Sequence, residues 1–146
     1  MREILFRGKR VDNGEWAEGY FCKGYFSELP HDRYGIMYKT KPIPGKWHLA
    51  YMTTEIDFET VGQYIGLTDK NGKRIFDGDI IRCGGKVVGV VNYHDCCFCV
   101  RFIMKDHANR SNPAMDIIEN EYPNDIEVIG NIHDNPELLG GDIHGN

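Results

Sequence analysis

The sequence predicts a mainly β protein whose second half forms a small barrel or sandwich. Glycine is frequent, with 17 among 146 residues, and the chain also contains 8 tyrosines and 7 phenylalanines. Glycine supplies tight turns, and aromatic side chains suit the half-buried surface of a pleated strand. Between residues 60 and 132, short apolar segments alternate with turn residues, a spacing typical of antiparallel β folds.

The first predicted element is a β-hairpin. Ile4 and Phe6 share one face of a candidate strand, and residues 16–22 form the return strand. Asn13 and Gly14 suit a two-residue turn in which both residues have positive φ. Gly19 lies inside the return strand, where a residue without a side chain predicts a bulge or a close backbone approach.

The rest of the chain is divided by turn signals. Two aromatic segments, 34–38 and 47–52, are predicted short strands in a stretch broken by prolines. Gly84 and Gly85 predict a hairpin turn, residues 105–115 are polar enough to predict a loop, and Asn135 predicts the N-cap of a short helix that ends near residue 139. The predicted strands of the second half are 61–65, 80–83, 86–93, 96–103 and 126–129.

This pattern predicts two parts and a tail. Residues 1–57 form an N-terminal β subdomain, residues 58–139 form the barrel with its short C-terminal helix, and residues 140–146 form a flexible tail. Loops carry function on rigid scaffolds, so the segments 23–57 and 104–124 are the predicted variable binding surface.

Composition limits the setting and the partners. The net charge is −5, which disfavours bulk nucleic-acid binding but permits a local basic face. No apolar run approaches the ~20 residues that span a bilayer, and the first residues do not resemble a secretory signal. We therefore expect a cytoplasmic protein with no membrane contact, whose five cysteines are thiols.

Several segments together resemble the YopX family. The resemblance implies a protein encoded by a phage or prophage, with a mainly β fold that includes an SH3-like barrel. It supplies no catalytic residue to carry over. The matching segments are residues 2–9, 14–16, 64–73 (YIGLTDKNGK), 76–81 (FDGDII), 126–132 (IEVIGNI) and 135–139 (NPELL).

A cluster of cysteines suggests a metal site. Cys97 and Cys99 can share one face of a strand, and His94 can approach them through the preceding turn, so these three are the candidate ligands. A tetrahedral zinc site needs four nitrogen or sulfur ligands, however, and no second ligand pair stands at finger spacing. The alternative is that free cysteines fill the β core and its edge, with no cofactor.

Basic residues suggest a nucleic-acid interface. They crowd the N-terminus and a turn near residue 70, where Tyr64 or Phe76 could stack on bases. The alternative is a solvated hairpin face whose edge cations deter aggregation. The candidates are Arg2, Arg7, Lys9, Arg10, Lys70, Lys73 and Arg74.

Aspartates near residue 70 are interpreted as turn residues. Asp69, Asp77 and Asp79 lie in segments rich in Asp and Gly, a composition typical of turns. An EF-hand calcium loop is excluded because Lys73 occupies a position where that loop needs a ligand. The sequence also lacks P-loop, dinucleotide-binding and serine-hydrolase motifs.

The functional prediction is a non-catalytic interaction module that binds a phage or host macromolecule in the cytoplasm of the host cell. A nucleic-acid-binding protein that uses the basic hairpins is the first alternative. A metal-binding protein or enzyme centred on the His/Cys cluster is the second. Exposed strand edges also suggest a homo-oligomer.

Overall fold

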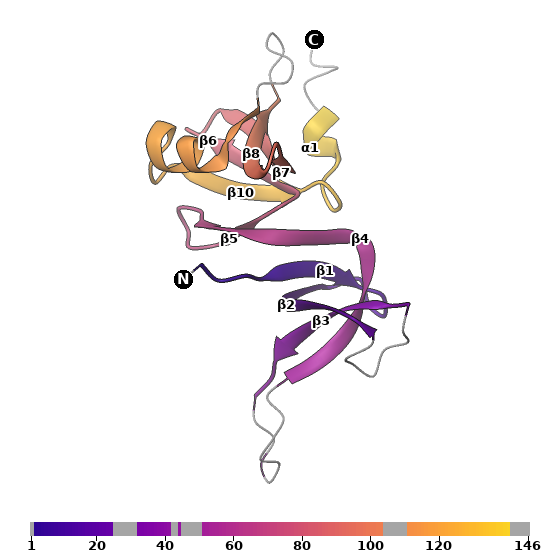
Figure 1. Ribbon diagram of the computed structural model, residues 1–146. Coiled ribbons are helices and arrows are strands. Elements are labelled where there is room, and N and C mark those ends of the chain that lie inside the picture. Colours follow the sequence, from indigo (N-terminus) through magenta and orange to yellow (C-terminus); the bar gives the residue numbers. More distant parts are fainter. Residues whose placement is uncertain (1, 25–31, 42–43, 45–50, 104–110, 141–146) are drawn as a thin grey trace. The chain divides into compact units, whose positions relative to one another are not determined.

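The computed structural model describes residues 2–24, 32–41, 44, 51–103 and 111–140 (Figure 1). The chain divides into two compact units, Met1–Tyr64 and Ile65–Asn146. The described residues are mainly β, as predicted, with two short helical segments in the second unit. No helix in these residues is long and apolar enough to cross a membrane.

The first unit is built from four strands whose pairings close a ring. β1 pairs with β2, β2 with β3 and β3 with β4, and β1 also pairs with β4, all antiparallel. Leu5, Ile36 and Ile56 are buried in this unit. The strands are β1 (Phe6–Arg10), β2 (Trp16–Lys23), β3 (Tyr34–Lys39) and β4 (Tyr51–Thr68).

Close backbone approach explains the glycine inside β2. A Cβ atom at Gly19 would lie 2.2 Å from the carbonyl oxygen of Met37, a separation that real Cβ atoms do not show. The predicted close approach at this position is therefore confirmed, and it lets β2 and β3 pair tightly.

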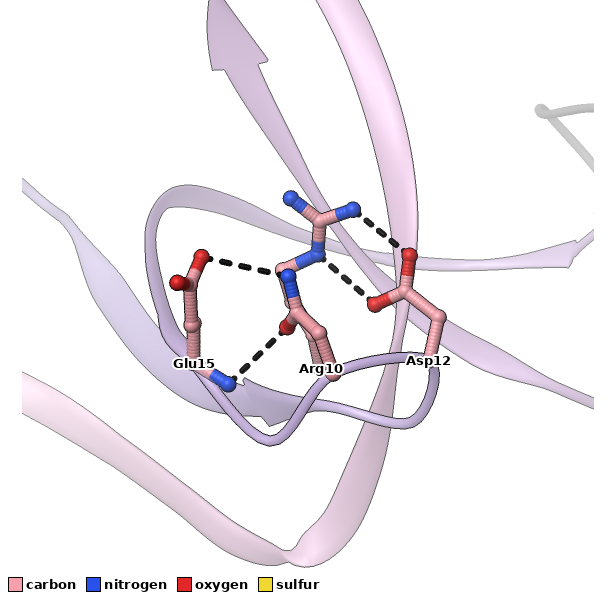
Figure 2. A network of polar contacts seen from close by, with 4 residues as sticks. Arg10, Asp12 and Glu15 are labelled. Atoms are coloured by element: carbon pink, nitrogen blue, oxygen red, sulfur yellow. Dashed lines mark hydrogen bonds and ion pairs between the residues drawn. The ribbon is translucent and has the colours of Figure 1, made fainter.

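The turn between β1 and β2 is longer than predicted. The Arg10 amide donates to the Glu15 carbonyl (2.9 Å), and the Gly14 amide donates to the Arg10 carbonyl (2.9 Å), so four residues form the turn. Gly14 has a φ of 72°, but Asn13 keeps a negative φ. The predicted two-residue turn was wrong because side-chain hydrogen bonds favour the longer loop: the Asn13 Oδ1 accepts the Glu15 amide at 2.9 Å (Figure 2).

β4 changes direction between its two contacts with β1. Its residue Ile56 pairs with Arg10, and Gln63 pairs with Phe6, with a shift of register between them. Inside the irregular segment, the Thr60 hydroxyl donates to the Asp57 carbonyl (2.6 Å) and accepts the Lys9 amide (2.8 Å). These bonds satisfy backbone groups where the ladder is interrupted, and Figure 1 shows the resulting bend.

The second unit contains an antiparallel sheet in the order β10-β6-β7-β8-β9. Its core gathers Ile75, Ile81, Val91, Val100 and Ile117, each fully buried. The elements are β5 (Arg74–Phe76), β6 (Asp79–Cys83), β7 (Val87–His94), β8 (Cys97–Phe102), β9 (Ser111–Pro113), the π-helix η2 (Asp116–Glu121), β10 (Ile126–Asn131) and α1 (Glu137–Gly140).

Turn predictions in this unit had mixed outcomes. Gly84 and Gly85 both have positive φ, 56° and 69°, which confirms the predicted hairpin turn. Cys96 was expected at the start of a strand, but it lies in the β7–β8 turn with a φ of 64°. A tight antiparallel hairpin needs two positive-φ residues at this point, so Asp95 and Cys96 adopt that conformation.

The polar segment 105–115 is not wholly a loop. β9 pairs with β8, with Ser111 opposite Arg101, because the backbone of β8 can pair with a third strand whatever that strand's polarity. Residues 104–110 lie outside the described part. Most of the predicted strand at 47–52 also lies outside it, and β4 begins at Tyr51.

The helix near the C-terminus is present but begins later than predicted. α1 starts at Glu137, and the carbonyl of Asn135 accepts the Leu138 amide at 3.1 Å. The Asn135 side chain instead accepts the Asn131 amide at 3.3 Å. It therefore ties the turn to β10 and does not cap the helix. The predicted tail lies outside the described residues from residue 141 onward.

Candidate functional site

The four N-terminal cations of the predicted nucleic-acid interface lie in the first unit. Arg7 is only 7% exposed, and its guanidinium carbon lies 4.7 Å from the centre of the Trp16 ring. The Lys9 ammonium lies 5.6 Å from the same ring. Cations stack favourably on an indole face, so this ring engages the charged groups of both residues. Arg2 is exposed.

Arg10 is engaged by a neighbouring carboxylate (Figure 2). Its Nε and Nη2 donate to the two carboxylate oxygens of Asp12, at 2.9 and 2.6 Å. These side-chain hydrogen bonds lower the pKa of Asp12 and raise that of Arg10. The bidentate pair fixes the planar guanidinium against the turn that follows β1.

The other three predicted cations lie in the second unit, around the turn between β4 and β5. Lys70 reaches carboxylates of Asp125 (3.9 Å) and Glu127 (3.7 Å). Lys73 and Arg74 are exposed. The seven candidates are thus divided between the two units. Three of them are already engaged within the protein: Arg7 is buried, and Arg10 and Lys70 lie beside carboxylates.

Asp69 is a structural residue of the same turn. Its Oδ1 accepts the amides of Asn71 (2.8 Å) and Lys73 (2.9 Å), and its Oδ2 accepts the amide of Val128 (3.0 Å). Burial alone would raise the pKa of Asp69, but these three hydrogen bonds outweigh it and the pKa is lowered. Because β10 is an edge strand, the turn covers backbone groups that would otherwise be unpaired.

Asp79 also has a local structural role. Its side chain is fully buried, and its Oδ2 accepts the Phe76 amide at 2.8 Å. The bond closes the turn between β5 and β6. Both aspartates therefore hold turns of the second unit, as the turn interpretation predicts.

Two of the three predicted metal ligands come together. The Sγ atoms of Cys97 and Cys99 are 3.4 Å apart, which confirms that the two side chains share a face of β8. The His94 ring is directed elsewhere, with Nδ1 3.0 Å from Asp95, and only its carbonyl oxygen meets the thiols. Within the described residues, no group of three or more His, Cys, Asp or Glu could hold a metal ion.

The cysteines differ in their surroundings. The hydrogen bond with Cys99 is the main cause that raises the pKa of Cys97. Burial raises the pKa of Cys83 to about 12, so this thiol stays protonated and is inert as a nucleophile. Cys22 also has a raised pKa, again because of burial.

A hollow in the first unit was not predicted from the sequence. It is an open cavity of about 550 Å³ formed by the end of β1, the turn after it, the start of β3 and the middle of β4. Its described lining consists of Lys9, Arg10, Val11, Gly14, Asp32, Arg33, Tyr34, Glu55, Ile56, Asp57 and Phe58.

Aromatic rings form the apolar part of the hollow. The rings of Tyr34 and Phe58 lie 4.4 Å apart, Phe21 stacks on Tyr34 at 5.6 Å, and Phe21 also lies 6.3 Å from Phe58, so the three rings pack as a triangle. Phe58 is nevertheless 51% exposed. The cluster continues to Phe6, whose ring is 5.7 Å from Phe21. An exposed aromatic side chain on a supported cluster is typical of a binding surface.

Charges of both signs surround these rings. The cations in the lining are Lys9, Arg10 and Arg33, and the carboxylates are Asp32, Glu55 and Asp57. The Arg33 Nη1 lies 3.0 Å from the Glu55 carboxylate. The hollow is therefore charge-balanced. Tyr34 stood in a predicted aromatic strand, but nothing local in the sequence placed it beside Phe58.

The chain belongs to the YopX family, because the family's sequence model, described as YopX protein, matches residues 6–140. Among solved structures, the chain is similar to the crystal structure of protein EF1440 from Enterococcus faecalis. The two share 24% identity and a TM-score of 0.51, over 95% of this chain and 99% of that one. This similarity concerns the fold alone. No curated protein matches the chain.

Proposed function

We propose that this protein is a non-catalytic interaction module that binds a segment of a partner protein in the hollow of its first unit. The observation that carries the proposal is the exposed Phe58 ring on the Phe21–Tyr34 stack, inside an open, charge-balanced cavity. Aromatic anchors surrounded by polar rims contribute most of the binding energy in protein interfaces.

Charge balance favours a protein segment over a nucleic acid. A phosphate backbone is bound by unopposed cations, whereas the three cations of the hollow are matched by three carboxylates. The partner segment would place one apolar side chain against Phe58 and Tyr34. On either side of that apolar side chain, an acidic residue of the partner segment would pair with Arg33 and a basic residue would pair with Asp57.

The setting and the finer fold are part of the same proposal. The second unit would be an SH3-like barrel, which its antiparallel β10-β6-β7-β8-β9 sheet and short connections support. The family resemblance supports a phage or prophage accessory protein that acts in the host cytoplasm. One fold can carry many functions, so the residues of the hollow, and not the fold, define the proposed binding site.

The test compares two single substitutions with the unchanged protein in a tagged pull-down from cells that carry the phage. Phe58→Ala removes the exposed ring of the hollow. Tyr20→Ala is the matched control, because Tyr20 is equally exposed at 52% in the same unit but does not line the hollow.

A stoichiometric protein partner should be recovered with the unchanged chain and with Tyr20→Ala. With Phe58→Ala the affinity should fall by about 30-fold, the effect of losing a 2 kcal/mol anchor. Equal recovery with Phe58→Ala would refute the role of the hollow. Binding to DNA at low salt that weakens steeply as salt rises would instead support the nucleic-acid alternative.

A further inference from the structure

We propose that Cys97 and Cys99 form a two-thiol clamp that binds one monovalent copper ion. The proposal is independent of the hollow, because both cysteines belong to the second unit. It rests on the distance between their sulfur atoms, on the ligand count around them and on the backbone of the hairpin that carries them.

The two sulfurs are already close to a chelating separation. They lie 3.4 Å apart on one face of β8, at its first and third residues. An ion held by two thiolates alone favours a near-linear sulfur–metal–sulfur angle, so with metal–sulfur bonds of about 2.3 Å the two sulfurs are about 4.6 Å apart. The pair therefore needs to open by roughly 1.2 Å, which rotation about the Cα–Cβ bonds of the two side chains supplies.

The ligand count decides between thiophilic metals. Thiolates select monovalent copper, zinc and iron–sulfur clusters. A structural zinc site needs four protein ligands, and an iron–sulfur cluster generally needs four cysteines. The described residues offer no group of three or more suitable side chains here, and the His94 ring faces Asp95. Monovalent copper accepts two thiolates, so it is the ion that fits.

The hairpin presents these thiols near its tip. Asp95 and Cys96 form the turn between β7 and β8 with φ values of 48° and 64°. Positive φ values favour glycine, yet position 96 is a cysteine. The hairpin tip therefore carries a third, exposed thiol, Cys96, where glycine would be less strained. Cys97 is partly exposed and Cys99 is buried, so an ion can enter from the side of Cys97.

Binding exchanges two protons for one ion. In the free protein, both thiols donate weakly toward the His94 carbonyl oxygen, at 3.5 and 3.7 Å. On binding, the two S–H bonds break, the protons pass to solvent and two copper–sulfur bonds form. Copper enters and stays in the monovalent state, so no oxidant or reductant takes part in the step.

The experiment loads the full chain anaerobically with Cu(I) from a weak complex and then challenges it with a colorimetric Cu(I) chelator. Native mass spectrometry counts the ions retained. Cys97→Ser and Cys99→Ala each remove one thiol of the clamp. Cys22→Ser is the matched control, because this cysteine is in the first unit and the serine hydroxyl can still donate to the Gly35 carbonyl, as the thiol does at 3.4 Å. Far-UV circular dichroism reports whether each variant is folded.

We expect one ion per chain in the unchanged protein and in Cys22→Ser. Retention in folded Cys97→Ser should fall at least tenfold, and Cys99→Ala should behave in the same way. X-ray absorption of the loaded chain should show sulfur ligands only. The clamp is refuted by failure of the unchanged chain to retain Cu(I), by unchanged retention in Cys97→Ser, or by stoichiometric Zn(II) binding in place of copper.

Discussion

The Asp69 carboxylate offers a direct test of how the second unit is held together. Asp69→Asn keeps the size of the side chain, and its amide oxygen can still accept the Asn71 and Lys73 amides. Its amide nitrogen, however, would face the amide of Val128, which now donates to Oδ2 at 3.0 Å. One hydrogen bond to a charged group would be lost and a donor in β10 would be left unpaired.

The cost follows from the typical energies of such bonds. A hydrogen bond to a charged group contributes about 1.5–3 kcal/mol, and an unpaired buried donor costs a similar amount. Since Asp69 is only 7% exposed, solvent can replace the bond only in part. We therefore expect Asp69→Asn to destabilise the second unit by about 2–3 kcal/mol.

Hydrogen exchange with mass spectrometry is the suitable assay, because it reports each unit separately. Protection of amides in β10 (Ile126–Asn131) should fall by about 30-fold or more in Asp69→Asn. Asp95→Asn is the control: its carboxylate is 86% exposed, and asparagine tolerates the positive φ of this position. The role of Asp69 is refuted if the amides of β10 are equally protected from exchange in Asp69→Asn and Asp95→Asn.

The pH dependence of the same variant provides a second check. The folded-state pKa of Asp69 is lowered, so its contribution is complete above the unfolded-state pKa of about 3.9. The contribution is lost as the pH falls through the lower, folded-state pKa. The unchanged chain and Asp69→Asn should therefore differ in urea denaturation at pH 7 and converge in strongly acidic solution. A difference that stays constant with pH would contradict this role of the carboxylate.

Three further substitutions test other parts of the fold by urea denaturation. Gly19→Ala should destabilise the first unit by 2 kcal/mol or more, because the new Cβ meets the Met37 carbonyl; fluorescence of Trp16 reports that unit. Phe76→Ala should cost about 3–5 kcal/mol, since this side chain is 1% exposed. Cys96→Gly should stabilise the second unit by about 1 kcal/mol through relief of positive φ, and a loss of stability would contradict the strain argument.

Much of the local structure could be predicted because its causes are local. The glycine pair at 84 and 85 adopts positive φ wherever a tight hairpin needs it. Alternation along a strand placed Cys97 and Cys99 on one face, and the missing side chain of Gly19 indicated a close approach. The turn at Asn13 was predicted wrongly because its two-residue signal competed with the hydrogen bond that the Asn13 side chain accepts from the Glu15 amide.

The candidate sites depended on contacts that no local pattern encodes. Val128 lies 59 residues from Asp69, and nothing near either residue indicates that they meet. Phe58 is an unremarkable exposed aromatic in the sequence, and it becomes part of a site only because β3 and β4 bring Tyr34 beside it.

The sequence by itself determined the β class, most turn positions and the membership of the YopX family, because periodicity, glycine placement and family segments are properties of neighbouring residues. Only the tertiary structure decided which cations are engaged by carboxylates or rings and where the aromatic hollow opens. It also showed that the His94 ring turns away from the thiols. Strand pairing joins residues that are distant along the chain, and the register of that pairing sets which side chains meet.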